Sequence, residues 1–137
     1  MTAIPQPIRI PIVIPSMSRA EHITTHKMVS GALICVPESQ HQAYKEHCPN
    51  NEVLPHPDAL KGLPAKRAWI NERFDTVFQI DDDITGMFHM GAPPGEKQTF
   101  YTPDEIAHII QATYETALEM GCHVFGFNGL GLDAVGD

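Results

Sequence analysis

Three consecutive carboxylates follow a short apolar segment in the middle of the chain. Asp81, Asp82 and Asp83 come directly after residues 76–80, which read Thr-Val-Phe-Gln-Ile. Because like charges repel, these aspartates either lie in water at a turn or are held together by a cation. In an extended backbone alternate side chains point to one side, so Asp81 and Asp83 can share a ligand, whereas Asp82 faces away and should tolerate replacement. Mg²⁺ and Mn²⁺ bind carboxylate and phosphate oxygens together, so the pair predicts a metal site that holds a diphosphate.

A local basic group precedes the aspartates in an otherwise acidic chain. The sequence has 9 Lys and Arg against 17 Asp and Glu, a net charge of -8. That balance argues against non-specific binding of nucleic acid, although a nucleic acid could still be a substrate. Lys61, Lys66 and Arg67 lie close together in the sequence, and a phosphate is expected there.

Length and composition predict one domain over residues 1–137. No apolar run approaches the ~20 residues that cross a membrane, and four prolines interrupt the first fifteen residues, unlike a signal peptide. Three widely spaced cysteines suit reduced thiols better than a disulfide framework. We therefore expect a cytoplasmic protein, without a membrane partner.

Strand and helix patterns alternate up to the aspartates. Apolar segments predict strands at 12–14, 32–37, 52–54 and 76–80. Between them, helices are expected at 19–31, at 40–48 after a Ser39–Gln42 capping box, and at 63–74 with Pro64 in the first turn. This order predicts an α/β fold, a mostly parallel sheet flanked by helices, in which ligands gather at the carboxyl ends of the strands.

The chain after the aspartates predicts a hairpin or lid turned at 93–95, a helix from 103 to about 120 and a last strand at 122–127. Thr102 and Glu105 form a capping box for that helix, and Gly121 ends it. Its apolar face includes Leu118. The glycine-rich residues 128–137 are expected to be a flexible tail.

Two enzyme classes use a strand that ends in Asp-x-Asp. Asp81, Asp83 and Thr85 match the first motif of haloacid-dehalogenase-type phosphotransferases, which would make Asp81 a nucleophile and Asp83 an acid/base. That family needs further motifs on later strands, and they are not found after Thr85. A solvated acidic turn or a non-catalytic nucleotide-binding or assembly module is the alternative without chemistry.

The second class is the metal-dependent glycosyltransferases of GT-A fold, and this resemblance extends over four segments. "IVIPSMSRAEHIT", "ALICVPESQHQAY", "LKGLPAKRAWINE" and "VFQIDDDI" resemble that fold's nucleotide loop, second strand, sugar-nucleotide helix and metal-binding strand. The resemblance implies a Rossmann-like domain that binds a nucleotide-diphosphate sugar, with Mn²⁺ or Mg²⁺ at Asp81 and Asp83. The residues that it implies in donor binding are Pro15, Ser16, Arg19, Glu38, Gly62, Lys66, Arg67 and Asp81.

More narrowly, the same segments are similar to the phage and eukaryotic glycosyltransferases associated with TET/JBP-type oxygenases. That similarity implies sugar transfer to a hydroxyl acceptor, with a hydroxymethylated DNA base as the candidate and phage-encoded expression in a host cytoplasm as one setting. The resemblance covers roughly residues 8–90, so the donor half is matched and the acceptor half, with its general base, is not. We therefore expect a fold that is incomplete at its C-terminus: a truncated product, a minimal enzyme that completes its site by homo-oligomerisation, or a binder without turnover.

Overall fold

A parallel four-stranded sheet forms the centre of the fold. The structure is a computed structural model that describes residues 9–88 and 99–127. In these residues the strands are β1 (Ile12–Pro15), β2 (Leu33–Pro37), β3 (Val53–His56) and β4 (Phe78–Gln79). Their order across the sheet is β3-β2-β1-β4, and all three neighbouring pairs are parallel. The predicted α/β class is confirmed, with a sheet that is wholly parallel in the described part of the chain.

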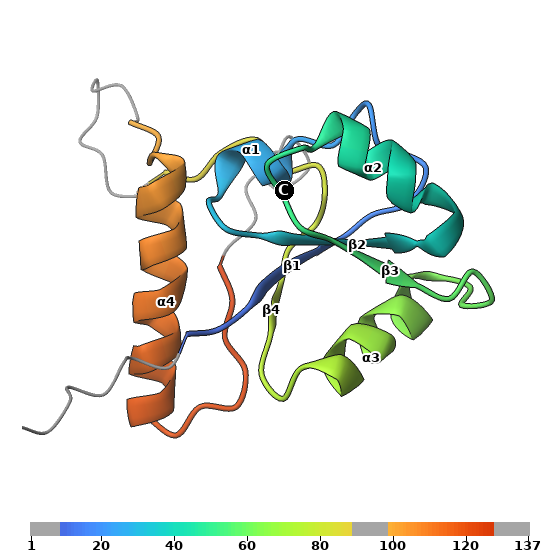
Figure 1. Cartoon of the computed structure of the whole chain (residues 1–137). Helices are drawn as coiled ribbons and strands as arrows, with labels where there is room; N and C mark the ends of the chain where they lie inside the picture. Colours follow the sequence, from blue (N-terminus) through green and yellow to red (C-terminus); the bar gives the residue numbers. More distant parts are fainter. Residues whose placement is uncertain (1–8, 89–98, 128–137) are drawn as a thin grey trace, which may run out of the picture.

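Helices cover both faces of this sheet (Figure 1). They are α1 (Thr25–Met28), α2 (His41–His47), α3 (Leu63–Arg73) and α4 (Pro103–Glu119), and a short 3-10 turn, Glu38–Gln40, precedes α2. α1, α2 and α4 pack on one face, and α3 packs on the other. The chain winds from β1 outward to β3 and then returns to the other side of β1 through α3. The direction of winding thus reverses between β1 and β4, and ligands of open α/β sheets bind at such a switch point.

Alternating side chains of β1 and β2 explain how the two faces are filled. Ile12 and Ile14 point into the larger apolar cluster, under α1, α2 and α4. Val13 points the other way and packs with Cys35 and with Ile70 of α3. A strand covered on both faces is apolar at successive positions, which is why these segments read as continuous hydrophobic runs.

α4 is the helix that the sequence predicted most closely. The side chain of Thr102 accepts a hydrogen bond from the backbone of Glu105, whose own side chain bonds back, and this completes the capping box. Gly121, which follows the helix, has a φ of +72°, a left-handed conformation suited to glycine. Leu118 was wrongly placed on the buried face, because its side chain is exposed.

The first predicted helix is mostly absent. Instead of a helix over 19–31, the structure has a turn at residues 19–22 and then only the four residues of α1. The backbone N–H groups of Thr24 and Thr25 donate to the carbonyl of Asp82, 3.0 and 3.4 Å away. These tertiary bonds occupy donors that a longer helix would use, so the local apolar pattern does not decide the structure here.

Other local predictions were also wrong. The Ser39–Gln42 capping box does not form, because the N–H and hydroxyl of Ser39 both donate to Asp58. β3 runs to His56, two residues beyond the predicted end. β4 is a half-buried strand of 2 residues instead of a buried one over 76–80.

Residues 122–127 were predicted as a strand and form none. They lie beside β4, where the ring of Phe125 stacks on that of Phe78 at 5.5 Å, but they make no sheet ladder in the described part of the chain. The flanks of the predicted hairpin do meet, through an antiparallel bridge between Phe88 and Phe100. The turn at 93–95 and the tail at 128–137 lie outside the described residues.

Candidate functional site

A small pocket lies at the carboxyl ends of the strands, on the switch point between β1 and β4. Its volume is about 310 Å³, at the lower end of the ~300–1,000 Å³ typical of ligand sites. Six of the residues that the sequence singled out line it: Pro15, Ser16, Gly62, Lys66, Asp81 and Asp83. Residues from three separate segments therefore converge on one cavity, as the parallel sheet requires.

Two loops meet at the pocket through the side chain of Asp82. The hydroxyl of Ser16, just after β1, donates to Asp82 Oδ2 at 2.6 Å, and Arg19 Nε lies 3.2 Å from the same oxygen. Tyr44 of α2 is fully buried, and its hydroxyl lies 2.7 Å from Ser16 Oγ and accepts the backbone N–H of Arg19 at 3.0 Å. The expectation that Asp82 faces away from Asp81 and Asp83 is therefore wrong: Asp82 lines the same pocket, and its carboxylate joins the loop after β4 to the loop after β1.

The backbone of the aspartate loop is held from the other side by the start of α1. The hydroxyl of Thr25, which is fully buried, donates to the carbonyl of Asp81 and accepts the N–H of Ile84 at 2.9 Å. The Thr24 hydroxyl donates to the carbonyl of Ile84, also at 2.9 Å. With the two amide bonds to Asp82, these contacts fix the loop in one conformation, so the flanking carboxylates start from a defined position.

Asp81 and Asp83 are the two carboxylates that remain accessible. Both side chains are exposed and line the pocket, and Asp81 Oδ1 accepts from the guanidinium of Arg67 at 2.8 Å. Among residues 9–88 and 99–127, no group of three or more His, Cys, Asp or Glu is placed to hold a metal. The pair could supply two oxygen ligands to a hard cation, and the others would have to come from a ligand and water.

Lys66 and His56 form the buried wall of the pocket. The ammonium of Lys66 donates to the carbonyl of Ser16, and burial lowers its pKa, although the nearby Cys35 and Asp82 act in the opposite direction. Burial also lowers the pKa of His56, the last residue of β3. Since a carbonyl only accepts, His56 Nδ1 donates to the Pro57 carbonyl at 2.9 Å. Lys66 thus brings a basic side chain into the pocket that the aspartates also line.

Three of the predicted donor-binding residues, Arg19, Glu38 and Arg67, do not line this pocket, and Arg67 lines a larger cavity instead. Glu38 is exposed at the carboxyl end of β2 and does not line the pocket. Arg19 and Arg67 are each engaged in an ion pair with an aspartate. Gly62 precedes α3 with a φ of +85°, which a residue with a side chain adopts only with strain.

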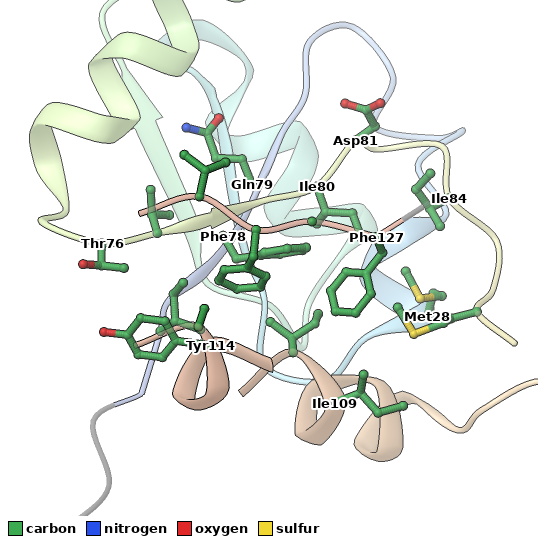
Figure 2. Close-up of a pocket in the computed structure, with 18 of the residues that line it drawn as sticks. Met28, Thr76, Phe78, Gln79, Ile80, Asp81, Ile84, Ile109, Tyr114 and Phe127 are labelled. Carbon is green, nitrogen blue, oxygen red and sulfur yellow. The ribbon is translucent and has the colours of Figure 1, made fainter. Parts of the chain in front are cut away.

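A second, much larger cavity lies beside the first. It has a volume of about 1600 Å³ and lies between β4, residues 122–127 and α4. Figure 2 shows side chains from all three around this cavity, among them Phe78 of β4, Tyr114 of α4 and Phe127, while the carboxylate of Asp81 points away from them. Asp81 and Asp83 line both cavities. The cavities therefore meet at the proposed metal ligands.

Comparison with protein families decides between the two enzyme classes. A family model described as TET-Associated Glycosyltransferase matches residues 10–132, most of the chain. The chain belongs to the TET-associated glycosyltransferases. Searches of curated proteins and of solved structures find no match. For this glycosyltransferase the phosphotransferase interpretation of Asp81, Asp83 and Thr85 is set aside.

Sequence reasoning missed three residues of the candidate site: Thr25, Tyr44 and His56. Thr25 and Tyr44 lie on helices, and no local sequence signal shows that their hydroxyls reach loops far away in the sequence. His56 could have been found, because it ends a parallel strand, and such positions face the ligand edge of the sheet.

Within the described residues, none of the helices has the length and apolar character needed to cross a membrane.

Proposed function

We propose that this glycosyltransferase binds a nucleotide-diphosphate sugar in the small pocket, with Mn²⁺ or Mg²⁺ at Asp81 and Asp83, and transfers the sugar to a hydroxyl acceptor. The observation that carries the proposal is the convergence of Asp81, Asp83, Lys66 and Ser16 at the switch point of the sheet. Anionic and cationic groups side by side in one pocket suit a ligand that brings both phosphates and a metal ion.

The carboxylates fit the proposed cation. Asp81 and Asp83 offer oxygen ligands on an accessible surface, as a hard cation prefers, and the phosphate oxygens of the donor would supply more. When bound, the cation would neutralise the diphosphate as it leaves. Two basic residues of the chain would position the carboxylates and the phosphates. Arg67 orients the Asp81 carboxylate through their ion pair, and the buried ammonium of Lys66 places positive charge on the phosphate side of the pocket.

The acceptor that we propose is a hydroxymethylated DNA base, which the family relationship supports. With a net charge of -8, the chain has little general attraction for a phosphate backbone. Recognition would then depend on the modified base more than on the duplex charge. We therefore expect an acceptor base that is accessible at an end, a loop or a flipped-out position.

The test is a calorimetric titration of the full chain with uridine-diphosphate sugars, with and without Mn²⁺. Asp83→Asn should abolish the metal-dependent part of the affinity, because it removes a charged ligand of the cation. Asp75→Asn is the matched control: Asp75 is exposed and lines only the larger cavity, so affinity should remain. Absence of metal-dependent nucleotide binding in the wild type would overturn the proposal.

Turnover is measured separately, as sugar release or transfer to DNA that carries hydroxymethylated bases. Transfer that depends on the modified base would support the proposed acceptor. Donor binding without release or transfer would instead identify a nucleotide-sugar binder. Unmodified DNA of the same sequence is the control acceptor.

A further inference from the structure

The hydrogen bonds around Asp82 have only one consistent direction. The carboxylate can only accept, so the single hydrogen of Ser16 Oγ goes to Asp82 Oδ2, at 2.6 Å. The 2.7 Å contact between Ser16 and Tyr44 must then be donated by the Tyr44 hydroxyl. The Tyr44 oxygen accepts in turn from the backbone N–H of Arg19.

These bonds close into a ring that begins and ends at one residue. Arg19 donates its backbone N–H to Tyr44, and its side-chain Nε lies 3.2 Å from the oxygen of Asp82 that Ser16 also reaches. We call these four residues, Ser16, Arg19, Tyr44 and Asp82, the Asp82 ring. Every hydroxyl hydrogen in it is used, and bonds that polarise one another in the interior strengthen together. Because Tyr44 and Ser16 are buried, water cannot easily replace a lost partner.

The Asp82 ring joins the two loops on either side of the switch point. Ser16 and Arg19 belong to the loop after β1, and Asp82 belongs to the loop after β4. The first loop contains Ser18, whose φ of +56° is unusual for a residue with a side chain. Gln40 accepts the N–H of Ser18 at 2.6 Å, and this bond adds to the restraint from Tyr44. Such a conformation persists only where its surroundings determine it.

We propose that Tyr44 is a positioning residue for the donor site. It acts through Ser16 and Asp82 to hold Asp81 and Asp83 in a fixed position relative to the loop after β1. Tyr44 does not line the small pocket, so it has no direct contact with a ligand there. Its effect is to reduce the reorganisation needed when a metal and a nucleotide diphosphate bind. The inference rests on the proposed function, since it concerns the same pocket.

The first experiment replaces Tyr44 by Phe, which removes one oxygen and keeps the packing. We expect Tyr44→Phe to weaken Mn²⁺-dependent binding of uridine diphosphate about five- to twentyfold, because Ser16 and the Arg19 amide each lose a partner. Tyr114→Phe is the matched control, a buried tyrosine of α4 that lies outside the small pocket, and its affinity should equal that of the wild type.

A second variant tests the other end of the ring. Asp82→Asn keeps an oxygen that can accept from Ser16 but loses the charge that attracts Arg19. We expect a loss of affinity at least as large as that of Tyr44→Phe. In both variants the electron paramagnetic resonance spectrum of Mn²⁺ in the nucleotide complex should change, because the carboxylates take a wider range of positions. A tyrosine that only stabilised the fold would leave this spectrum unchanged.

Amide hydrogen exchange tests the ring without any ligand. The Arg19 N–H should be protected in the wild type and should exchange at least about tenfold faster in Tyr44→Phe. Unchanged exchange, or wild-type affinity in Tyr44→Phe, would overturn the inference alone. A wild type that binds no uridine diphosphate would overturn the proposed function, and the inference with it.

Discussion

The two cavities that meet at Asp81 and Asp83 are built from opposite kinds of contact. The small pocket is held by polar contacts, which are the Asp82 ring and the Thr25 hydroxyl. The large cavity is lined mainly by aromatic and aliphatic side chains of β4, α4 and residues 122–127, and its lining also includes the ion-paired Arg67 and Asp81. One region is thus positioned by directional bonds and the other by apolar packing.

This difference separates the expected effects of mutation. Hydrogen bonds fix orientation but contribute only modestly to net stability, whereas buried apolar area contributes most of the folding free energy. Changes on the small-pocket side should therefore reduce ligand affinity more than stability. Changes on the large-cavity side should do the reverse.

The largest effect is expected for Ile110→Ala on the large-cavity side. Ile110 is fully buried in α4, and truncating it should lower the free energy of unfolding by about 2–5 kcal/mol. Chemical denaturation measures the loss. At a temperature where the variant is folded, nucleotide affinity should stay within about twofold of the wild type. A selective loss of affinity would break the comparison, because it would show that α4 positions the small pocket.

Thr25→Val should have a smaller effect on stability and a clear one on affinity. It leaves the Asp81 carbonyl and the Ile84 N–H without their buried partner, at a cost of about 1–3 kcal/mol. The matched control is Thr113→Val in α4, where the hydroxyl donates at 2.7 Å to Ile109 within the same helix. Denaturation together with nucleotide titration should show a loss of affinity for Thr25→Val alone. If Thr25→Val and Thr113→Val bound the nucleotide equally well, the hydrogen bonds of the Thr25 hydroxyl would not be needed to position the aspartate loop.

Gly62→Ala should cost about 1–3 kcal/mol of unfolding free energy, because its φ of +85° and ψ of 154° lie in a region that essentially only glycine adopts. Gly31→Ala is the control: its φ is +79°, and an added Cβ would meet no atom within 4 Å. Both variants should lose stability in thermal unfolding. Only Gly62→Ala should also weaken nucleotide binding, since Gly62 lines the small pocket. A loss of affinity in both would contradict the local role of Gly62.

The smallest effect concerns pH. Burial lowers the pKa of His56 below 6.5, so at mildly acid pH the unfolded chain binds a proton that the folded chain does not. The stability of the fold should be fully present above pH 6.5 and fall as pH decreases through that value toward the lowered pKa. His56→Gln should flatten this fall, as measured by denaturation between about pH 7.5 and 5.5. Part of the fall should remain in this variant, because the pKa of His26 is also lowered. If stability fell with pH as much in His56→Gln as in the wild type, the prediction would be contradicted.

The fold was more predictable than the site, for reasons visible in single elements. α3 and α4 carry their own start signals, Pro64 and the Thr102 capping box, so both were predicted close to their observed bounds. The predicted length of the first helix was wrong because the amides of Thr24 and Thr25 bond to a residue more than fifty positions away. The prediction of a strand at residues 122–127 was wrong because apolar character alone does not supply a hydrogen-bonded neighbour.

Asp82 illustrates the limit within the site itself. Alternation in an extended strand placed its side chain opposite those of Asp81 and Asp83. In the structure all three aspartates line the same small pocket, and Asp82 links two loops because its carboxylate accepts from Ser16 and pairs with Arg19.

By itself, the amino-acid sequence determined the α/β class, the order of the strands along the chain and the glycosyltransferase family, because these depend on local periodicity and on motifs in a fixed order. Only the tertiary structure decided which groups meet: Tyr44 with Ser16, Ser16 with Asp82, and Thr25 with the backbone on either side of Asp82. Side-chain hydrogen bonds act over about 3 Å, and residues far apart in sequence come that close only when the sheet aligns the ends of its strands.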